Sequence, residues 1–387
     1  MKEGRLILIL GLTGFVVMAD NWVVSPILPA IAKSIGVSPV RAGLLISAYM
    51  IPFGLFQLVF GPLSDRYGKR QVINFSMVFF TVGTGLCGLG VGLFDLALYR
   101  AITGVFAASV MPICLALIGD VVPMERRQQA IGTFMGIAFL GQGLSMAVGG
   151  SIAYFVSWRG VFFVYATLSV LSTLLLYFAG RKAPSKKNPH SRFIKPYVDL
   201  VRNRRSLLIY LVVLFEGILI IGSFSYLGAY TEYLFKFNYL AIGLTLTAFG
   251  AGAVITGRLV GKIVPRIGRL NTLSLGLISA MIADGIFFIA RVHPILLITG
   301  VALLGIGFMM AHSSLLTLAT EFAKAARGTA MSLVAFCFMG GGGVGTVIGG
   351  RVIGLSGYAH FYVLFGVLLF GLLVAARMVV KEANLRE

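Results

Sequence analysis

The stretch Gly61-Pro62-Leu63-Ser64-Asp65-Arg66-Tyr67-Gly68-Lys69-Arg70 decides the fold of this chain. It is a short, charged turn between two long apolar segments. A reduced copy follows 200 positions later, as Gly261-Lys262-Ile263-Val264-Pro265-Arg266-Ile267-Gly268-Arg269. A basic, glycine-containing turn that occurs twice at one offset predicts two related halves, each with a tight loop at the same membrane face.

The same offset of 200 positions relates many other residues of the two halves. The identical pairs include Gly43 and Gly243, Leu44 and Leu244, Ala48 and Ala248, Arg127 and Arg327, Ala130 and Ala330, and Gly149-Gly150 with Gly349-Gly350. A constant offset over most of each half is hard to produce by chance. The two halves are therefore predicted to be parallel repeats, related by an axis along the membrane normal.

Composition makes the bilayer the solvent for most side chains. Of the 387 residues, 58% are hydrophobic and only 12% are charged, whereas a soluble domain has about 25% charged residues. Apolar segments of about 20 residues cross the hydrocarbon core as helices, and no alternation typical of a β-barrel appears. The expected spans are 6–32, 41–61, 71–93, 96–121, 129–156, 160–180, 207–234, 239–261, 270–291, 294–321, 328–354 and 358–380. We predict an all-α membrane protein with twelve transmembrane helices in two pseudo-symmetric six-helix bundles.

The basic residues predict topology and not nucleic-acid binding. The net charge is +19, but the charges lie in short loops between apolar segments. With the N-terminus inside, 25 of the 32 Lys and Arg residues are cytoplasmic, so both termini are expected in the cytoplasm and the chain in the plasma (inner) membrane. Residues 181–206 form the only long polar segment, predicted to be a surface linker or a short interfacial helix. It separates an N-terminal bundle, residues 1–180, from a C-terminal bundle, residues 207–387.

Several motifs resemble the major facilitator superfamily over essentially the whole chain. The motif Gly61-x-x-x-Asp65-Arg66-x-Gly68-Lys69-Arg70 after the second span is specific to that family in this position. Asp20-Asn21-x-x-x-Pro26-x-Leu28-Pro29 in the first span resembles the signature of its twelve-span drug:proton antiporter branch, and Arg100-x-x-x-Gly104 is similar to its membrane-embedded arginine. Gly132, Gly141, Gly149 and Gly150 fit the antiporter motif of the fifth span, in which Ser145 and Met146 replace Gly-Pro.

The resemblance implies alternating access, in which two bundles rock around a central substrate site. It also implies that Asp65 and Lys69 form a charge cluster with Asp120, at the end of the fourth span, and that this cluster latches the outward-open state. Gly61, Arg66, Gly68 and Arg70 belong to the same predicted conformational switch. The family implies a monomer that binds a small-molecule substrate in the lipid bilayer.

Asp20 and Arg100 are expected to meet inside the membrane. A charge in hydrocarbon costs at least about 2.5 kcal/mol, so each one requires a partner or a function. Counted along helices, Asp20 lies about 21 Å from the inner face and Arg100 about 24 Å from it. We predict a shared polar network, in which protonation of Asp20 loosens the pair and couples a proton gradient to transport. The alternative is a static pair that only fixes helix packing.

Three further ionisable residues lie within apolar segments. Glu216, about 13 Å deep in the seventh span, is predicted to bind a cation or a second proton, with a structural hydrogen-bonded carboxyl as the alternative. Glu216, Ser223, Tyr226 and Tyr230 recur near helical spacing and are expected to form one polar face. His312, at the repeat position of Pro112, is expected to be either a hydrogen-bonded structural residue or a pH-sensitive cavity group. Asp284 lies in the ninth span, which is peripheral in the family.

Aromatic and polar residues near the midplane are candidates for a substrate cavity, although helix packing explains aromatic residues equally well. The predicted cavity residues are Asn21, Trp22, Tyr49, Phe53, Tyr226, Tyr230, His312 and Phe336. Gly340-Gly341-Gly342-Gly343 lacks the Lys-Ser/Thr ending of a phosphate loop and predicts close helix packing instead. Cys87, Cys114 and Cys337 show no ligand spacing. We therefore expect no cofactor, no metal and no catalytic residues, with the proton gradient as the energy source.

The sequence favours a secondary active transporter that exports small apolar or cationic compounds in exchange for protons. An exporter of a polar metabolite, such as a sugar, amino acid or nucleoside, is the nearest alternative. A lipid flippase, a proton symporter and a membrane receptor on the same scaffold are further alternatives.

Overall fold

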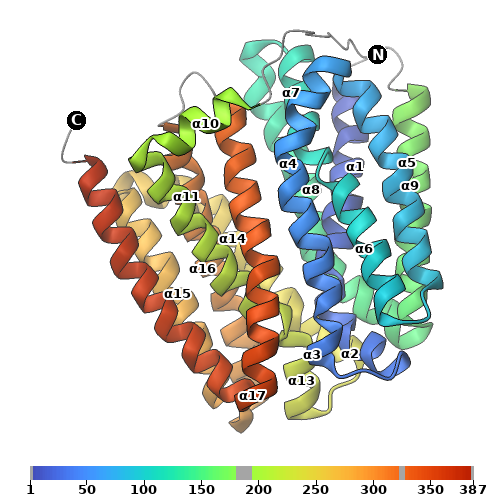
Figure 1. The fold of residues 1–387 in the computed structure, drawn as a ribbon, viewed down its shortest axis with the longest axis vertical. Coiled ribbons are helices and arrows are strands. Elements are labelled where there is room, and N and C mark those ends of the chain that lie inside the picture. The colour runs from blue at the N-terminus through green and yellow to red at the C-terminus, as the bar shows by residue number, and fades with distance from the viewer. Residues whose placement is uncertain (1–2, 180–193, 322–326, 385–387) are drawn as a thin grey trace.

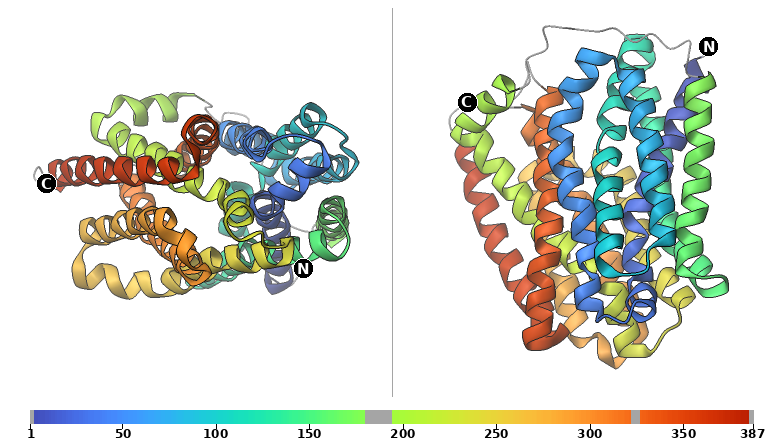
Figure 2. Two further views of the ribbon diagram at one scale, coloured as in Figure 1. Left: turned by 90° about the horizontal axis from the view of Figure 1, so that it is seen from below. Right: turned by 45° about the vertical axis from the view of Figure 1, so that its right-hand side comes forward.

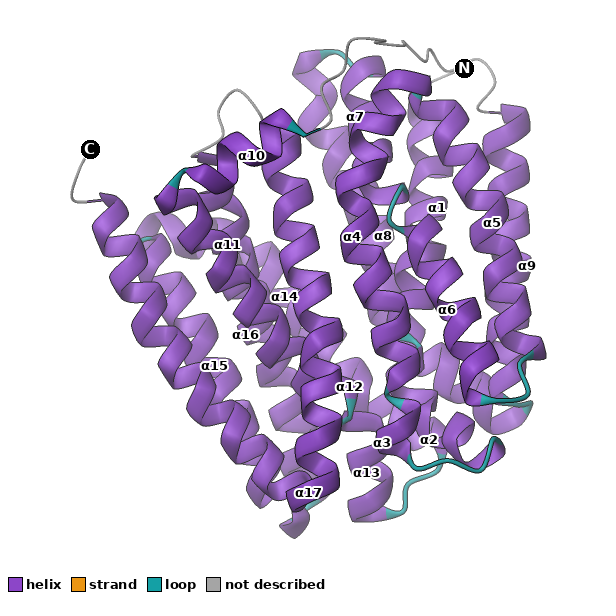
Figure 3. Ribbon diagram, in the orientation of Figure 1, coloured by secondary structure: helices purple, strands orange, loops and turns teal. Residues whose placement is uncertain are grey.

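The computed structural model describes residues 3–179, 194–321 and 327–384, which form helices joined by short loops, with no strand among them (Figure 3). Residues 181–193 of the predicted linker lie outside the described part of the chain. The N-terminal half consists of α1 (Glu3–Trp22), α2 (Val24–Ser34), α3 (Pro39–Ala42), α4 (Leu44–Tyr67), α5 (Lys69–Leu89), α6 (Leu93–Ala107), α7 (Val110–Val121), α8 (Met124–Phe155) and α9 (Trp158–Ala179).

The C-terminal half has the same plan, preceded by the short helix α10 (Lys195–Arg202). It consists of α11 (Arg204–Glu216), a π-helical turn (Gly217–Ile221), α12 (Gly222–Ser225), α13 (Leu227–Phe235), α14 (Tyr239–Ile267), α15 (Arg269–Ile289), a 3₁₀ turn (Ala290–Val292), α16 (Pro294–Glu321) and α17 (Arg327–Asn384). Figure 1 shows the long helices running roughly along one axis, whereas α10 lies across one end of the bundle. Polar caps mark where several of them begin: the side chains of Asn203 and Asn238 accept backbone N–H bonds at the starts of α11 and α14.

The helices account for the expected number of spans. Ten helical segments of the described chain are long and apolar enough to cross a membrane, or eleven if the bent pair α1–α2 is one span. The 58-residue α17 contains a non-helical residue, Gly357, where two helices meet. Dividing α17 there gives twelve spans, and the large apolar side chains exposed on their outer surfaces, such as Phe79, Phe94 and Leu98, suit a lipid environment.

The two halves repeat one another in detail. α5 and α15 have the same bounds shifted by 200 positions. The glycines before them, Gly68 and Gly268, have φ angles of 101° and 82°, a region that glycine occupies without the penalty of a Cβ atom. Their backbone N–H groups also close the preceding helices onto the carbonyls of Ser64 and Val264. The predicted internal repeat is therefore confirmed by equivalent helix boundaries and by equivalent turn glycines in the two halves.

The molecule has two distinct ends. The start of α1, the end of α17 and helix α10 lie at one end, which we call the termini face, and α2, α3 and α13 lie at the other, which we call the far face (Figure 1). The blue-to-green helices of the N-terminal half and the yellow-to-red helices of the C-terminal half form two groups (Figure 2). Between the halves, α4 packs along α17 and α8 packs along α14.

Helix α10 connects the halves at the termini face. The hydroxyl of Tyr197 donates a hydrogen bond to the carbonyl oxygen of Leu58 in α4, at 3.1 Å. Burial raises the pKa of Tyr197, so the hydroxyl stays a donor across the physiological range. The described part of the predicted linker is therefore a short helix packed on the bundle.

The halves are closed against each other at the far face. The hydroxyl of Ser25 donates to the carbonyl oxygens of Phe224 and Ser225, at 3.0 and 3.2 Å, and Ser47 donates to the carbonyl oxygen of Gly343 at 2.9 Å. Toward the termini face, a Cβ atom added at Gly132 of α8 or Gly261 of α14 would meet nothing within 4 Å, whereas one added at Gly150 would collide with Gly243. The structure thus has a sealed far face and looser contact toward the termini face.

Candidate functional site

A bend in the first span places the residues of the proposed site. α1 ends at Trp22 and α2 begins at Val24, with an angle of 49° between them. Pro26 has no backbone N–H, so the carbonyl of Trp22 loses its normal helical partner and the helix bends there. Asp20, Asn21 and Trp22 occupy the last turn before this bend, and they point toward different halves.

Asp20 points into the N-terminal half, where it meets Arg100 of α6. Arg100 Nη1 donates to Asp20 Oδ2 at 2.8 Å and approaches the Asp20 carbonyl oxygen at 3.4 Å. Their side chains are 0% and 1% exposed. The contact expected from the depths of the two residues is confirmed. A buried pair of this kind is held by mutual attraction and becomes costly when one partner loses its charge.

Aromatic rings of α4 cover the arginine. The Arg100 guanidinium carbon lies 4.1 Å from the centroid of the Tyr49 ring, a cation–π contact. Phe53 stacks on Tyr49 at 5.7 Å between centroids, and both are fully buried. Tyr49 and Phe53 were predicted as cavity residues, but the structure places them inside the N-terminal half. Asp20 Oδ1 and Arg100 Nε have no hydrogen-bond partner among the described residues.

Asn21 and Trp22 contact the C-terminal half. Asn21 Nδ2 lies 4.0 Å from the sulfur of Met339 in α17. The Trp22 ring packs against Phe224 at 5.2 Å and Phe249 at 5.4 Å between centroids. The space that these residues line with α12 has a volume of about 10 Å³, which is no more than a single water molecule needs. The predicted cavity is therefore closed at this level in this conformation.

A second ionisable pair, Glu216 and His312, lies in the C-terminal half. Glu216 Oε2 and His312 Nδ1 are 3.1 Å apart, with Glu216 fully buried and the His312 side chain 21% exposed. Glu216 is the last residue of α11, directly before the π-helical turn, a distortion that frequently marks functional sites. The sequence analysis selected both residues separately and did not predict that they meet.

An aromatic chain links the Trp22 contact to the Glu216–His312 pair. Phe249 stacks on Phe308 at 5.7 Å, and Phe308 stacks on the His312 ring at 5.4 Å. Phe338 packs against His312 at 4.3 Å. Phe249, Phe308 and Phe338 were not among the predicted cavity residues. Because phenylalanine is so common in this chain, only the fold identifies these three.

Asp284 belongs to a separate buried contact. Asp284 Oδ1 accepts a hydrogen bond from Ser223 Oγ at 2.5 Å, and the residue is 0% exposed. The polar face predicted from Glu216, Ser223, Tyr226 and Tyr230 does not form, because the π-helical turn shifts the helical phase between Glu216 and Ser223. Ser223 faces α15, whereas Glu216 faces α16.

Two more of the predicted cavity residues, Tyr226 and Tyr230, lie elsewhere, whereas the assignment of Phe336 to the cavity stays a prediction. Tyr226 donates to the carbonyl oxygens of Thr346, at 2.9 Å, and Val40, at 3.4 Å, near the far face. Tyr230 donates to the carbonyl oxygen of Phe287 at 2.6 Å and packs on Tyr358 and Tyr362. The backbone of Phe336 lies where α17 approaches Gly54 of α4. Tyr226 and Tyr230 therefore lie closer to the far face than the midplane position predicted for them.

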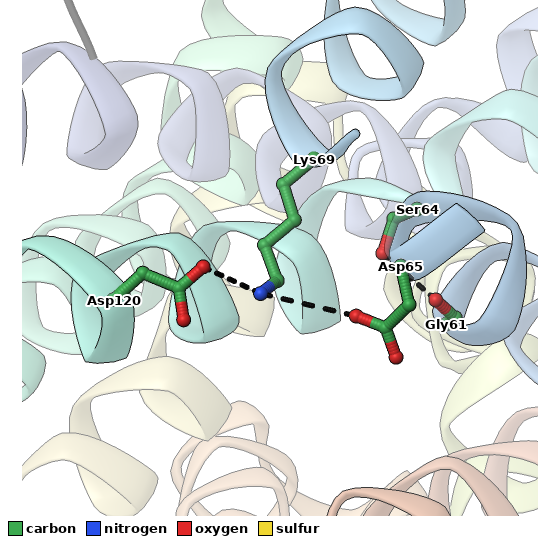
Figure 4. Close-up of polar contacts among 5 residues, drawn as sticks. All are labelled: Gly61, Ser64, Asp65, Lys69 and Asp120. Atoms are coloured by element: carbon green, nitrogen blue, oxygen red, sulfur yellow. Dashed lines mark hydrogen bonds and ion pairs between the residues drawn. The ribbon is translucent and has the colours of Figure 1, made fainter. Parts of the chain in front are cut away.

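The charged turn forms the expected cluster at the termini face (Figure 4). Lys69 Nζ lies 2.5 Å from Asp120 Oδ2 and 3.8 Å from Asp65 Oδ1. Ser64 Oγ donates to the Gly61 carbonyl oxygen at 2.8 Å, and the Arg66 guanidinium lies 5.8 Å from the centroid of the Tyr67 ring. Lys69, Asp65 and Asp120 all belong to the N-terminal half, so this cluster ties α4, α5 and α7 together.

Comparison with known proteins agrees with the fold and the motifs. The sequence matches the Major Facilitator Superfamily over residues 10–346. It is 28% identical over 349 residues to the uncharacterized MFS-type transporter YceJ of Bacillus subtilis (strain 168), which covers 87% of this chain and 86% of the relative. It is 29% identical over 170 residues to Multidrug resistance protein 3 of the same organism, covering 43% of this chain and 33% of that protein.

The fold is also that of a solved transporter. The crystal structure of the nucleoside transporter NupG (D323A mutant) superposes with a TM-score of 0.80 at 13% identity, covering 97% of this chain and 99% of the other. The match of most of the sequence to one family and the shared twelve-span fold establish a multi-pass membrane transporter and not an enzyme. This chain belongs to the Major Facilitator Superfamily.

Proposed function

We propose that this transporter exports small apolar or cationic compounds in exchange for protons. The observation that carries the proposal is the position of the Asp20–Arg100 pair. It is buried within one half and lies directly before the bend from which Asn21 and Trp22 contact the other half. A change of charge at Asp20 therefore acts on the joint between the two halves.

Protonation of Asp20 supplies the coupling step. A neutral Asp20 carboxyl no longer attracts Arg100. The guanidinium then remains in contact with the Tyr49 ring and the Asp20 carbonyl oxygen. Loosening the pair frees the end of α1 to change its angle to α2, and with it the far-face contacts of Ser25. Proton binding shifts the equilibrium between two conformations only if the proton binds them with different affinities. Breaking the Asp20–Arg100 ion pair in one conformation and not in the other produces such a difference.

The aromatic chain from Trp22 to His312 favours apolar, cationic substrates. Phe249, Phe308 and Phe338 offer ring faces to an apolar body, and the Glu216 carboxylate at the end of the chain offers a counter-charge. Glu216 Oε1 has no partner among the described residues, so it is an available acceptor. The relationship to Multidrug resistance protein 3 supports the same substrate class.

A polar metabolite is the second candidate substrate. The Asn21 amide, His312 and Glu216 lie around the same aromatic chain and match the donors and acceptors of a sugar, amino acid or nucleoside. In this case the rings stack on a sugar or base, and Glu216 and His312 accept and donate hydrogen bonds without a charged partner.

Further parts of the proposal concern location and switching. The excess of Lys and Arg at the termini face supports a cytoplasmic termini face in the plasma membrane, with the chain acting as a monomer. We propose that the Lys69 cluster holds α4, α5 and α7 as one unit when the halves rock, and that this unit latches the outward-open state. Gly61, Arg66, Gly68 and Arg70 give the turn its shape and charge.

Transport into proteoliposomes tests the proposal. An acid lumen drives uptake of ethidium, detected with entrapped DNA, if the protein exchanges protons for an apolar cation. A protonophore should abolish this uptake. Radiolabelled uridine and glucose, assayed in the same vesicles, distinguish the metabolite exporter. Ethidium uptake that is unaffected by the pH gradient would refute proton exchange.

A thermal-shift screen of drug-like and metabolite libraries at two pH values then narrows the substrate. A ligand of the proposed site should stabilise the wild-type protein and fail to stabilise Phe308→Ala, which shortens the aromatic chain. A ligand that stabilises both proteins equally binds elsewhere.

A further inference from the structure

The far face carries a groove that is separate from the aromatic chain. It has a volume of about 620 Å³ and lies where the outer ends of α3 and α4 face the outer end of the first part of α17. Its walls include the apolar side chains of Val40, Leu44, Val347 and Leu355. The two halves therefore share this groove, and it opens on the lipid-facing side of the protein.

The Tyr226 side chain lies between the two walls of the groove and keeps them apart. Its ring lies between the two glycines Gly43 and Gly350, and a Cβ atom on either glycine would collide with the Tyr226 hydroxyl. The hydroxyls of Ser47, Tyr226 and Thr346, which line the groove, are all used in hydrogen bonds to backbone carbonyls. The floor of the groove is therefore polar in composition but offers no free donor to a ligand.

Two arginines flank the groove and have no partner. Arg41 on α3 and Arg351 on α17 both line it and are exposed. Among the described residues neither guanidinium makes a hydrogen bond or an ion pair. Arg41 and Arg351 are also two of the seven Lys and Arg residues that were not assigned to the cytoplasmic side, where the other 25 lie. Their charge at this position is unexplained by topology or by packing.

The pseudo-symmetric position on the other side of the molecule provides an internal comparison. There α8 and α14 meet directly, because Gly150 contacts Gly243 and the carbonyl of Tyr239. At the offset of 200 positions, the residues equivalent to Arg41 and Arg351 are Ala241 and Ser151, and Pro26 is equivalent to Tyr226. The groove and its two arginines are thus a feature of one side only and do not follow from the repeat.

We propose that this groove binds an anionic phospholipid of the far leaflet. The phosphate lies between the guanidinium groups of Arg41 and Arg351, and one acyl chain lies along the apolar walls. Arginine binds phosphate oxygens through paired N–H donors, and basic residues beside an anionic membrane surface each add about fivefold to affinity. Because one arginine belongs to each half, the bound lipid favours the conformation in which the far face is closed.

Native mass spectrometry of the full-length protein tests this proposal. Purified protein is titrated with dioleoyl phosphatidylglycerol, and the affinity of the first bound lipid is compared with that for dioleoyl phosphatidylcholine. The double variant Arg41→Gln/Arg351→Gln should bind phosphatidylglycerol about twenty-fivefold more weakly, from a loss of about fivefold for each arginine. Its affinity for phosphatidylcholine should stay the same.

A charge-matched control is available on the same face. Lys33→Gln/Arg291→Gln removes two exposed basic residues outside the groove and should retain tight phosphatidylglycerol binding. An equal loss in both double variants would overturn the proposal, as would unchanged binding in Arg41→Gln/Arg351→Gln. Soluble glycerol phosphate should not displace the lipid; displacement at comparable concentration would indicate a site for free phosphate instead.

A second variant tests the acyl-chain part of the groove. Gly354→Leu places a side chain in open space, since a Cβ atom at Gly354 meets nothing within 4 Å. It should fold normally and weaken phosphatidylglycerol binding about fourfold for each methylene that it excludes from the groove. Full affinity in Gly354→Leu would show that the chain does not occupy the groove and would overturn the proposal.

Discussion

Asp20 and Arg100 form a 2.8 Å ion pair that is completely enclosed by the N-terminal half. The next two residues along the chain, Asn21 and Trp22, contact the C-terminal half. One turn of helix therefore connects Asp20, whose charge is expected to change, to Asn21 and Trp22, which lie on the surface along which the halves move.

The Asp20–Arg100 pair should be energetically coupled. Asp20→Asn and Arg100→Gln should each lower the free energy of unfolding by about 3 kcal/mol, because each leaves one buried group without its partner. The double variant should lose clearly less than the sum of the two. Chemical denaturation in detergent measures the double-mutant cycle. Strictly additive losses would show that the two side chains do not interact.

Glu216 should bind cationic substrates in competition with His312. Glu216 Oε2 lies 3.1 Å from His312 Nδ1, whereas Glu216 Oε1 has no partner among the described residues and is available to a cationic ligand. Glu216→Gln should weaken ethidium binding at least about tenfold, the value of one charge-assisted contact. His312→Gln should retain ethidium binding, because it leaves the Glu216 carboxylate in place.

Fluorescence polarisation of ethidium compares the three proteins. Unchanged affinity in Glu216→Gln would remove Glu216 from the site. Equal loss of ethidium binding in His312→Gln and Glu216→Gln would show that the Glu216 carboxylate is not the group that holds the cation.

The repeated turn glycines should be intolerant of a side chain. Gly68→Ala and Gly268→Ala force alanine into φ angles of 101° and 82° and should each destabilise the protein by about 1 kcal/mol or more. Gly261→Ala is the control, because it lies in the helix α14 with nothing within 4 Å of its Cβ position. It should leave stability unchanged or raise it slightly. Similar thermal shifts for all three variants would contradict the role of the two turns.

Lys69 should affect transport far more than stability. Lys69→Gln removes the cation that contacts both Asp65 and Asp120. Because these two side chains are 49% and 32% exposed, the loss of stability should stay below about 1 kcal/mol. Ethidium transport should fall at least about tenfold, because α4, α5 and α7 no longer move as one unit, while ethidium binding is retained. Lys262→Gln, on the same face and exposed, is the matched control. Full transport by Lys69→Gln would refute the switch.

The architecture was predictable because the bilayer imposes simple rules on sequence. Each span requires a long apolar segment, and the repeat fixed where the second half begins. Depth along a helix also placed Asp20 opposite Arg100. The same calculation puts both Glu216 and His312 about 13 Å from the inner face, given the expected spans 207–234 and 294–321. The equal depth of the two residues allows the contact that the structure shows.

The direction of a side chain around its helix could not be read in the same way. Tyr226 and Tyr230 follow Glu216 in the same span but are separated from it by the π-helical turn, which changes the helical phase. Apolar segments have little periodicity because both the lipid and the core accept the same residues. Tyr49, Phe53 and Phe336 were therefore assigned to a cavity, although packing positions suit them equally well.

Proton-driven transport by Asp20→Asn tests the central claim most directly. Proteoliposomes containing wild-type protein or Asp20→Asn are given the same acid lumen, and the initial rate of ethidium uptake is measured with and without a protonophore. The account predicts that Asp20→Asn binds ethidium and equilibrates it across the membrane, but that the pH gradient no longer drives accumulation. Accumulation by Asp20→Asn that remains sensitive to the protonophore would contradict it.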